Sequence, residues 1–252
     1  MENNNYSNYS YNTYENTDTI STNKAVAGSF LWMFLGALIT LFVGISSTSI
    51  VVNIAFNNPF TLMFIFLGCF VLQMILTSRI HKFIYTKPNF SKSLVSFILY
   101  SALTGFTFSF LFAYFDVVVL NQVFAGVSLY FLLLAFLTYI FRKKIHKAAG
   151  FAFVGLTTLL ISSTILLLVS MFAFGGAYFD AIYLAISILG ILVFSIITMV
   201  DIKRHYNNLQ YSNNKKLMML GFAFDLYLDF INIFIYVLRI LAILGRNSSR
   251  RD

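Results

Sequence analysis

Residues 221–245 read GFAFDLYLDFINIFIYVLRILAILG, a mostly apolar segment that is long enough to cross a membrane as a helix. Six positions in it carry glycine or a polar side chain, and their spacing of three or four residues places them along one helical face. They are Gly221, Asp225, Asp229, Asn232, Tyr236 and Arg239. Because the remaining residues are mostly aliphatic or aromatic, this polar stripe must face other helices or a water-filled cavity. We therefore expect the last helix to be central in a bundle.

The whole chain has the composition of a polytopic membrane protein. It has 252 residues, of which 59% are hydrophobic and 10% are charged, whereas soluble domains carry about 25% charge. Six apolar segments precede the last one, and a helix of about 20 residues spans the hydrocarbon core. The seven segments are 28–52, 60–77, 94–115, 123–141, 149–174, 179–200 and 217–244. We expect an all-α bundle of seven transmembrane helices in a lipid bilayer.

The two ends of the chain differ from this membrane domain, which we place at 25–245. Residues 1–24 consist mainly of Asn, Ser, Thr and Tyr without apolar periodicity, which predicts a disordered tail. Residues 246–252 form a short basic tail. This tail leaves the side of the C-terminus open, because basic residues are disfavoured outside the cell.

The basic residues indicate the orientation in the membrane. Twelve of the 17 Lys and Arg residues lie in the connections after the second, fourth and sixth segments, and none lies in the other three connections. Asp116 and Asp180 lie at that other face, where they could concentrate cations at an outer entrance. The positive-inside rule then places the N-terminus in the cytoplasm. The abundance of Asn, Lys, Ile, Phe and Tyr suggests an AT-rich genome and a bacterial cell membrane. We do not expect nucleic-acid binding from the net charge of +8.

Acidic residues in membrane helices are the strongest functional candidates. Asp225 and Asp229 lie one turn apart, and Asp201 ends the sixth segment at a comparable depth. Two adjacent carboxylates cannot both stay charged without a cation, so an acid pair shares a proton or binds a metal ion. Arg79, at the inner end of the second segment, is a candidate partner of Asp201 or a plain topology signal. Asn232, Tyr236 and Arg239 could equally hold helices together.

The segment 226–232, Leu-Tyr-Leu-Asp-Phe-Ile-Asn, resembles the signature of the transmembrane Bax-inhibitor-motif family. The resemblance implies that Asp201 and Asp229 form a di-aspartyl pH sensor and that Arg79 is a latch on Asp201. Proteins of this family are described as pH-dependent calcium leak channels, and some as regulators of cell death or of a membrane protease. Two features depart from the family pattern: Val200 replaces a common tyrosine, and Asp225 occupies a position that is usually uncharged.

These observations favour a proton-gated cation leak, with Ca²⁺ as the transported or bound ion and Asp201 and Asp229 as its ligands. The alternative is a scaffold that binds another membrane protein, such as a quality-control protease, with the N-terminal tail as a docking segment. We expect no enzymatic activity and no cofactor, because the three histidines, His81, His146 and His205, fall in basic connections and no HExxH or GxSxG motif occurs.

Overall fold

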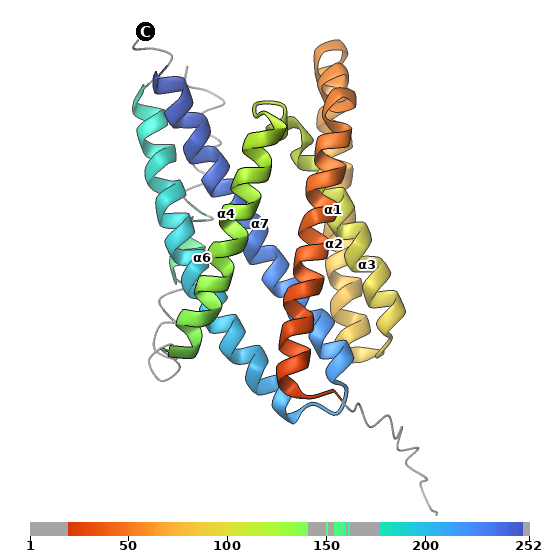
Figure 1. The fold of residues 1–252 in the computed structure, drawn as a ribbon. Coiled ribbons are helices and arrows are strands. Elements are labelled where there is room, and N and C mark those ends of the chain that lie inside the picture. Colours follow the sequence, from red (N-terminus) through yellow and green to blue (C-terminus); the bar gives the residue numbers. More distant parts are fainter. Residues whose placement is uncertain (1–19, 141–149, 151–153, 160, 162–176, 249–252) are drawn as a thin grey trace, which may run out of the picture.

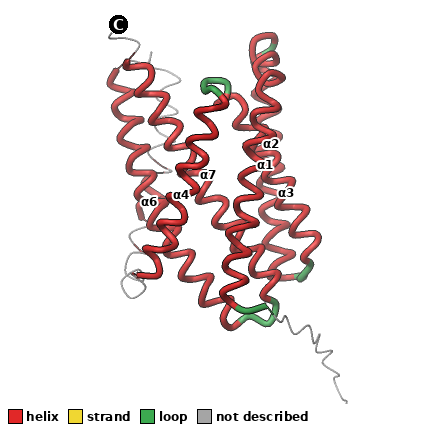
Figure 2. The backbone as a smooth tube through the Cα atoms, viewed as in Figure 1, coloured by secondary structure: helices red, strands yellow, loops and turns green. Residues whose placement is uncertain are grey.

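The computed structural model describes residues 20–140, 150, 154–159, 161 and 177–248, and this part of the chain is helical apart from short connections (Figures 1 and 2). The elements are α1 (Thr22–Asn57), α2 (Pro59–His81), a π-helical turn η1 (Lys82–Thr86), α3 (Phe90–Phe112), α4 (Val117–Ile140), α6 (Ala177–Tyr211) and α7 (Lys215–Ser248). No strand occurs in the described ranges, so the expected all-α class is confirmed.

Six helices in the described part of the chain are long and apolar enough to cross a membrane. They correspond to six of the seven expected segments, whereas the remaining one, 149–174, lies mostly outside the described residues. The end of α4 and the start of α6 lie at opposite ends of the bundle, and α7 runs from the α6 connection to the other end (Figure 1). The protein is therefore an integral membrane protein built from long antiparallel helices.

The helices extend beyond the apolar segments that predict them. α1 begins at Thr22, inside the stretch expected to be a tail, and the Ser21 side chain caps it by accepting a hydrogen bond from the Lys24 amide. α6 continues past Asp201 to Tyr211, so Asp201 lies about 15 Å before the helix end. The expectation that Asp201 closes this helix was wrong, because polar residues can continue a helix beyond the edge of the hydrocarbon.

α1 and α3 pack closely because small residues line their contact. Gly36, Thr40 and Gly44 recur every fourth residue on α1, and Ser101 and Gly105 lie opposite them on α3. A Cβ atom at Gly105 would lie 2.4 Å from the carbonyl oxygen of Thr40. The Thr40 hydroxyl lies 2.9 Å from the carbonyl oxygen of Ser101. The two backbones can approach this closely only because these side chains are small or absent.

α7 contacts α1, α3, α4, α6 and η1, and much of its surface is buried. Tyr227 is fully buried in an aromatic cluster, with its ring centroid 5.4 Å from that of Phe97 and 6.1 Å from that of Tyr100. Its hydroxyl lies 2.7 Å from Thr40 Oγ1. Either hydroxyl can donate in this contact, and Thr40 Oγ1 also lies within hydrogen-bond distance of the Gly36 and Ser101 carbonyl oxygens. One hydroxyl pair thus joins α7 to the α1–α3 pair.

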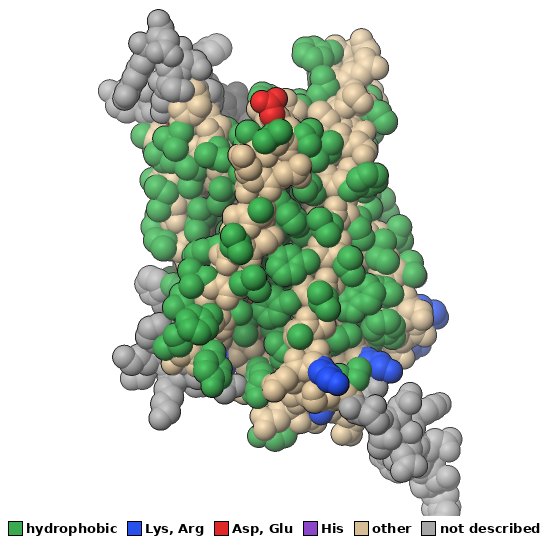
Figure 3. Space-filling view, in the orientation of Figure 1, with side chains coloured by type: hydrophobic (Ala, Val, Ile, Leu, Met, Phe, Trp, Pro, Cys, Tyr) green, Lys and Arg blue, Asp and Glu red, His purple; other side chains and the backbone are tan. Residues whose placement is uncertain are grey.

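Charged side chains separate to the two ends of the bundle on the face shown in Figure 3. Lys and Arg side chains gather at the end where α6 connects to α7, and the one acidic patch visible on this face lies at the opposite end. The surface between them is mostly hydrophobic. This distribution is typical of a protein whose middle faces lipid.

Replacing Gly105 with alanine should destabilise the bundle. The new methyl group would meet the backbone of α1 rather than a flexible side chain, so the helices must separate, at a cost of about 1–3 kcal/mol. Thermal unfolding of the purified full-length protein in detergent measures this loss. Gly126→Ala on α4 is the matched control, because a Cβ atom there meets nothing within 4 Å. Equal melting temperatures for the two variants would contradict the proposed close approach.

Candidate functional site

The connection between α6 and α7 is short, and it brings the acidic residues of both helices together. α6 ends at Tyr211 and α7 begins at Lys215, where the Asn214 side chain accepts a hydrogen bond from the Leu217 amide at 3.1 Å. In an antiparallel helix pair, residues at equal distances from the connection face each other. His205, six residues before the end of α6, meets Asp225, ten residues after the start of α7, so the two helices pack with an offset of about one turn. Asp201 and Asp229 are each one turn farther from the connection.

Five residues at this contact form what we call the acid cluster: Asp201, Arg204 and His205 on α6, and Asp225 and Asp229 on α7. Arg204 Nη2 lies 3.1 Å from Asp201 Oδ1 and 3.6 Å from Asp225 Oδ2. His205 Nε2 lies 2.7 Å from the same Asp225 oxygen. A cation and an imidazole of α6 thus both reach the same carboxylate oxygen on α7.

His205 is the most enclosed of these polar groups, with 2% of its surface exposed. Its ring stacks on Phe222 of α7, with centroids 4.5 Å apart and an angle of 17° between the planes. Nε2 must carry a hydrogen to bond the Asp225 carboxylate. The Arg204 nitrogen 3.4 Å away is also a donor and therefore makes no true hydrogen bond with Nε2. The contact with the Asp225 carboxylate thus determines which ring nitrogen carries the hydrogen.

The structure corrects the expectation that all three histidines lie in connections. His205 is buried inside α6, and His81 lies in the last turn of α2, where it stacks on Tyr85. His146 lies outside the described residues. His205 was missed because the apolar segment ends at residue 200, although Asp201, Arg204 and His205 have the spacing of one helical face. That spacing is the signal that could have identified both Arg204 and His205.

Asp229 is the most buried of the three acids, with 5% of its surface exposed. Its Oδ2 atom has no hydrogen-bond partner among the described residues. Thr198 and the charged groups of Asp201, Asp225 and Arg204 are its polar neighbours. Charging a carboxyl group without a partner in apolar surroundings is costly. Whether Asp229 is ionised therefore depends strongly on the charges and hydrogen-bond donors of the neighbouring groups.

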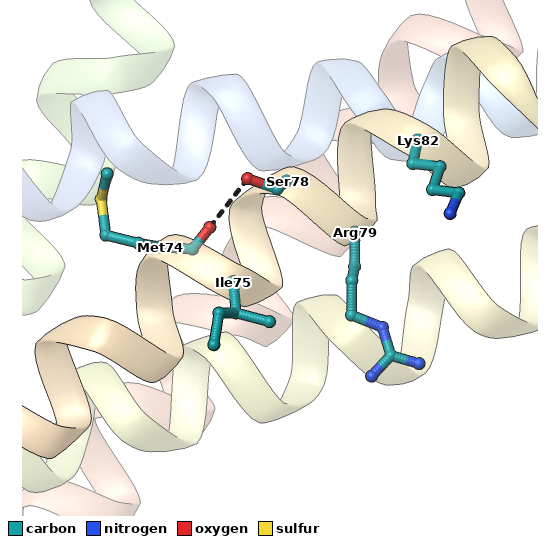
Figure 4. A pocket seen from close by; sticks show the side chains of 5 residues that line it. All are labelled: Met74, Ile75, Ser78, Arg79 and Lys82. Carbon is teal, nitrogen blue, oxygen red and sulfur yellow. Dashed lines mark hydrogen bonds between the residues drawn. The ribbon is translucent and has the colours of Figure 1, made fainter.

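The structure does not bring Arg79 to Asp201. Arg79 is exposed on α2, its guanidinium carbon lies 5.9 Å from the Phe83 ring centroid, and it lines a shallow pocket with Ser78 and Lys82. Figure 4 shows its side chain extending away from Ser78. Asp201 pairs with Arg204 instead. Arg204 is one turn along the same helix, so this pair forms without any approach of α2.

The outer part of the α7 polar stripe makes separate contacts. Asn232 Nδ2 donates to the Leu228 carbonyl of its own helix at 2.8 Å. The Arg239 guanidinium carbon lies 5.6 Å from the Tyr236 ring centroid and 5.9 Å from that of Tyr183 on α6. Of these contacts, only the one between Arg239 and Tyr183 joins α7 to another helix, whereas the Asn232 hydrogen bond stays within α7. The stripe is therefore not a single surface directed at one partner.

Asn232 also lines a cavity of about 340 Å³ between α2, α3 and α7. Its other polar walls include Gln73, Thr104 and Tyr227, and Gln73 Nε2 donates to Thr104 Oγ1 at 3.1 Å. Phenylalanine side chains of α2 and α3 supply apolar walls. The lining contains none of the acid cluster, so the two features are separate.

The two acids of the expected outer entrance differ in exposure. Asp116 is exposed just before α4, whereas Asp180, in the first turn of α6, has 8% of its surface exposed. Both helices begin at the end of the bundle opposite to the α6–α7 connection (Figure 1). Of the two, Asp116 is the one open to solvent.

The described residues contain no group of three or more His, Cys, Asp or Glu side chains that could hold a metal ion. Asp201 and Asp229, the predicted ligands, would therefore supply two carboxylates at most. Ca²⁺ takes six to eight oxygen ligands, so water would have to provide the others.

Replacing His205 with phenylalanine should destabilise the α6–α7 contact. The new ring can still stack on Phe222, but Asp225 loses its hydrogen bond from α6, at a cost of about 1–3 kcal/mol. Thermal unfolding in detergent measures the loss, and His81→Phe on the exposed end of α2 is the control. Adding Asp225→Leu should recover much of the stability, because both partners are then apolar. A loss that this second change deepens would contradict the expected pairing.

Comparisons with known proteins agree with this architecture. The family model described as "Inhibitor of apoptosis-promoting Bax1" matches residues 22–247. Inner membrane protein YbhL of Escherichia coli K12 is 26% identical over 217 residues, which cover 83% of this chain and 87% of YbhL. An uncharacterised protein of Borreliella burgdorferi is 29% identical over 235 residues, or 91% of this chain and 96% of that protein. Since the family match extends from the start of α1 to the last turn of α7, the chain belongs to the Bax inhibitor family.

Proposed function

We propose that this protein is a pH-sensitive calcium leak channel, gated by Asp201 and Asp229 between α6 and α7, and that it is not an enzyme. The observation that supports this proposal best is the Asp229 carboxyl group, which is buried and has an oxygen without a hydrogen-bond partner among the described residues. Its charged neighbours include Asp201 on the adjacent helix. Two such groups cannot both be ionised at little cost without a cation.

The gate would work through the charge on Asp229. When this carboxyl group is protonated, α6 and α7 can pack without repulsion between the two acids. When it loses its proton, a second negative charge lies near Asp201, and the pair either repels or attracts a divalent cation. Repulsion would weaken the contact between the two helices, whereas a bound divalent cation would offset it and occupy the position between the acids. Calcium ions would approach from the end of the bundle that carries the exposed Asp116.

The same proposal includes the arrangement in the membrane. We infer seven crossings with α7 as the central helix, a cytoplasmic N-terminus, and the acid cluster toward the cytoplasmic side. The basic residues at the end where α6 meets α7 support this orientation (Figure 3). The Escherichia coli relative is described as an inner membrane protein, which supports location in a bacterial cell membrane.

Calcium flux into liposomes that contain only the purified protein tests the channel. Flux should rise by about tenfold as the pH is raised across the titration of a single acid. Asp229→Asn removes the titrating group and should abolish most of this dependence, and Asp201→Asn should shift it. Asp18→Asn in the N-terminal region is the matched acid-to-amide control. Wild-type flux that does not change with pH would contradict the gate.

A second candidate function is a membrane scaffold that restrains another membrane protein. The family description names inhibition of another protein, which supports this alternative. Absence of flux at every pH, together with crosslinking of the intact protein to a specific membrane protein in native membranes, would favour the scaffold over the channel.

A further inference from the structure

Arg204 lies between carboxylates of two different helices. It is 3.1 Å from Asp201 on its own helix and 3.6 Å from Asp225 on α7. The guanidinium group has several donors in one plane, so a single arginine can serve two acids. With 57% of its side chain exposed, Arg204 is at the solvent edge of the cluster. It can therefore leave the acids without unfolding either helix.

His205 determines where the Asp225 carboxylate lies. The imidazole is buried, stacked on Phe222 and bonded to the Asp225 oxygen that Arg204 also approaches. This arrangement holds Asp225 within reach of Arg204. His205 is thus a positioning residue for the Arg204 contact.

The ionised side chains of the cluster carry a net negative charge, which favours the binding of a further cation. Asp201 and Asp225 contribute two negative charges when ionised, and Arg204 contributes one positive charge. The other titratable groups that face them are His205 on α6, Asp229 on α7 and Tyr85 on η1. No Lys side chain makes an ion pair with these acids in the described part of the chain. If Arg204 moves away, two carboxylates from two helices lose their arginine counter-charge at the edge of the cluster.

We propose that Arg204 is a tethered cation that occupies the position between Asp201 and Asp225 and competes there with hard divalent cations such as Ca²⁺. This inference rests on the proposed function, because it names the regulation of the same acid cluster. Arg204 here acts from within α6, so this latch requires no movement of α2. It also assigns a task to Asp225, the acid that lies outside the family pattern.

Equilibrium dialysis with radioactive Ca²⁺ tests the competition on the full-length protein in detergent. Arg204→Gln removes the tethered cation and should increase Ca²⁺ affinity by about two- to fivefold, as expected for a partly exposed ion pair. Lys203→Gln removes the same charge from the neighbouring position and should change the affinity little. Arg204→Lys keeps a cation and should restore an affinity near that of the wild type. Arg204→Gln with Asp225→Asn should lose the gain.

Equal Ca²⁺ binding by the Arg204→Gln and Lys203→Gln variants would overturn the inference, as would the absence of Ca²⁺ binding by Arg204→Gln. Thermal unfolding without Ca²⁺ verifies that each variant is folded, and Arg204→Lys keeps the test informative if the glutamine variant is unstable. The liposome assay separates this result from the channel proposal. Tighter binding by Arg204→Gln without wild-type flux retains the latch and rejects the channel, whereas pH-dependent flux with unchanged binding does the reverse.

Discussion

Three carboxyl groups share the contact between α6 and α7, and the cost of burying their charge shapes the whole site. For Asp225 this cost is offset by contacts with His205 and Arg204, and for Asp201 it is offset by the same Arg204. Asp229 has an oxygen without such a partner in the described structure. Within one helix pair, the acids thus differ in their contacts: Asp225 and Asp201 have charged or hydrogen-bonding partners, whereas Asp229 has an oxygen without one among the described residues. The first two acids join polar groups at the contact, and Asp229 is the acid best suited to exchange a proton.

The rest of the bundle holds α7 in place for this contact. Small residues bring α1 and α3 together, and the Thr40–Tyr227 hydroxyl contact joins that pair to α7. The aromatic rings around Tyr227 are packed edge to face. One side of α7 is therefore packed tightly against α1 and α3, while its other side carries acids toward α6. Any rearrangement driven by charge is expected on the α6 side.

Most residues of the family motif at 226–232 take no part in the ionic contacts of α7. Within 226–232, Leu226, Tyr227 and Phe230 are core residues, and Asn232 bonds its own helix. Asp229 is the titratable acid of the motif. The ionic contacts of α7 gather instead at Asp225, one turn before Asp229. A family signature therefore contains packing residues as well as ionisable ones, and a residue outside the signature can make most of the ionic contacts.

The sequence by itself determined the helical class, six of the membrane helices and the candidate acids, because apolar run length and the rarity of charge in lipid are properties of local sequence. It predicted Arg79 as the partner of Asp201 and placed His205 in a connection. Only the tertiary structure decided that Arg204 lies at Asp201 and that His205 is buried against Asp225. The physical reason is that such pairs depend on how far α6 continues beyond its apolar segment and on the register in which it meets α7. Neither quantity is set by local hydrophobicity.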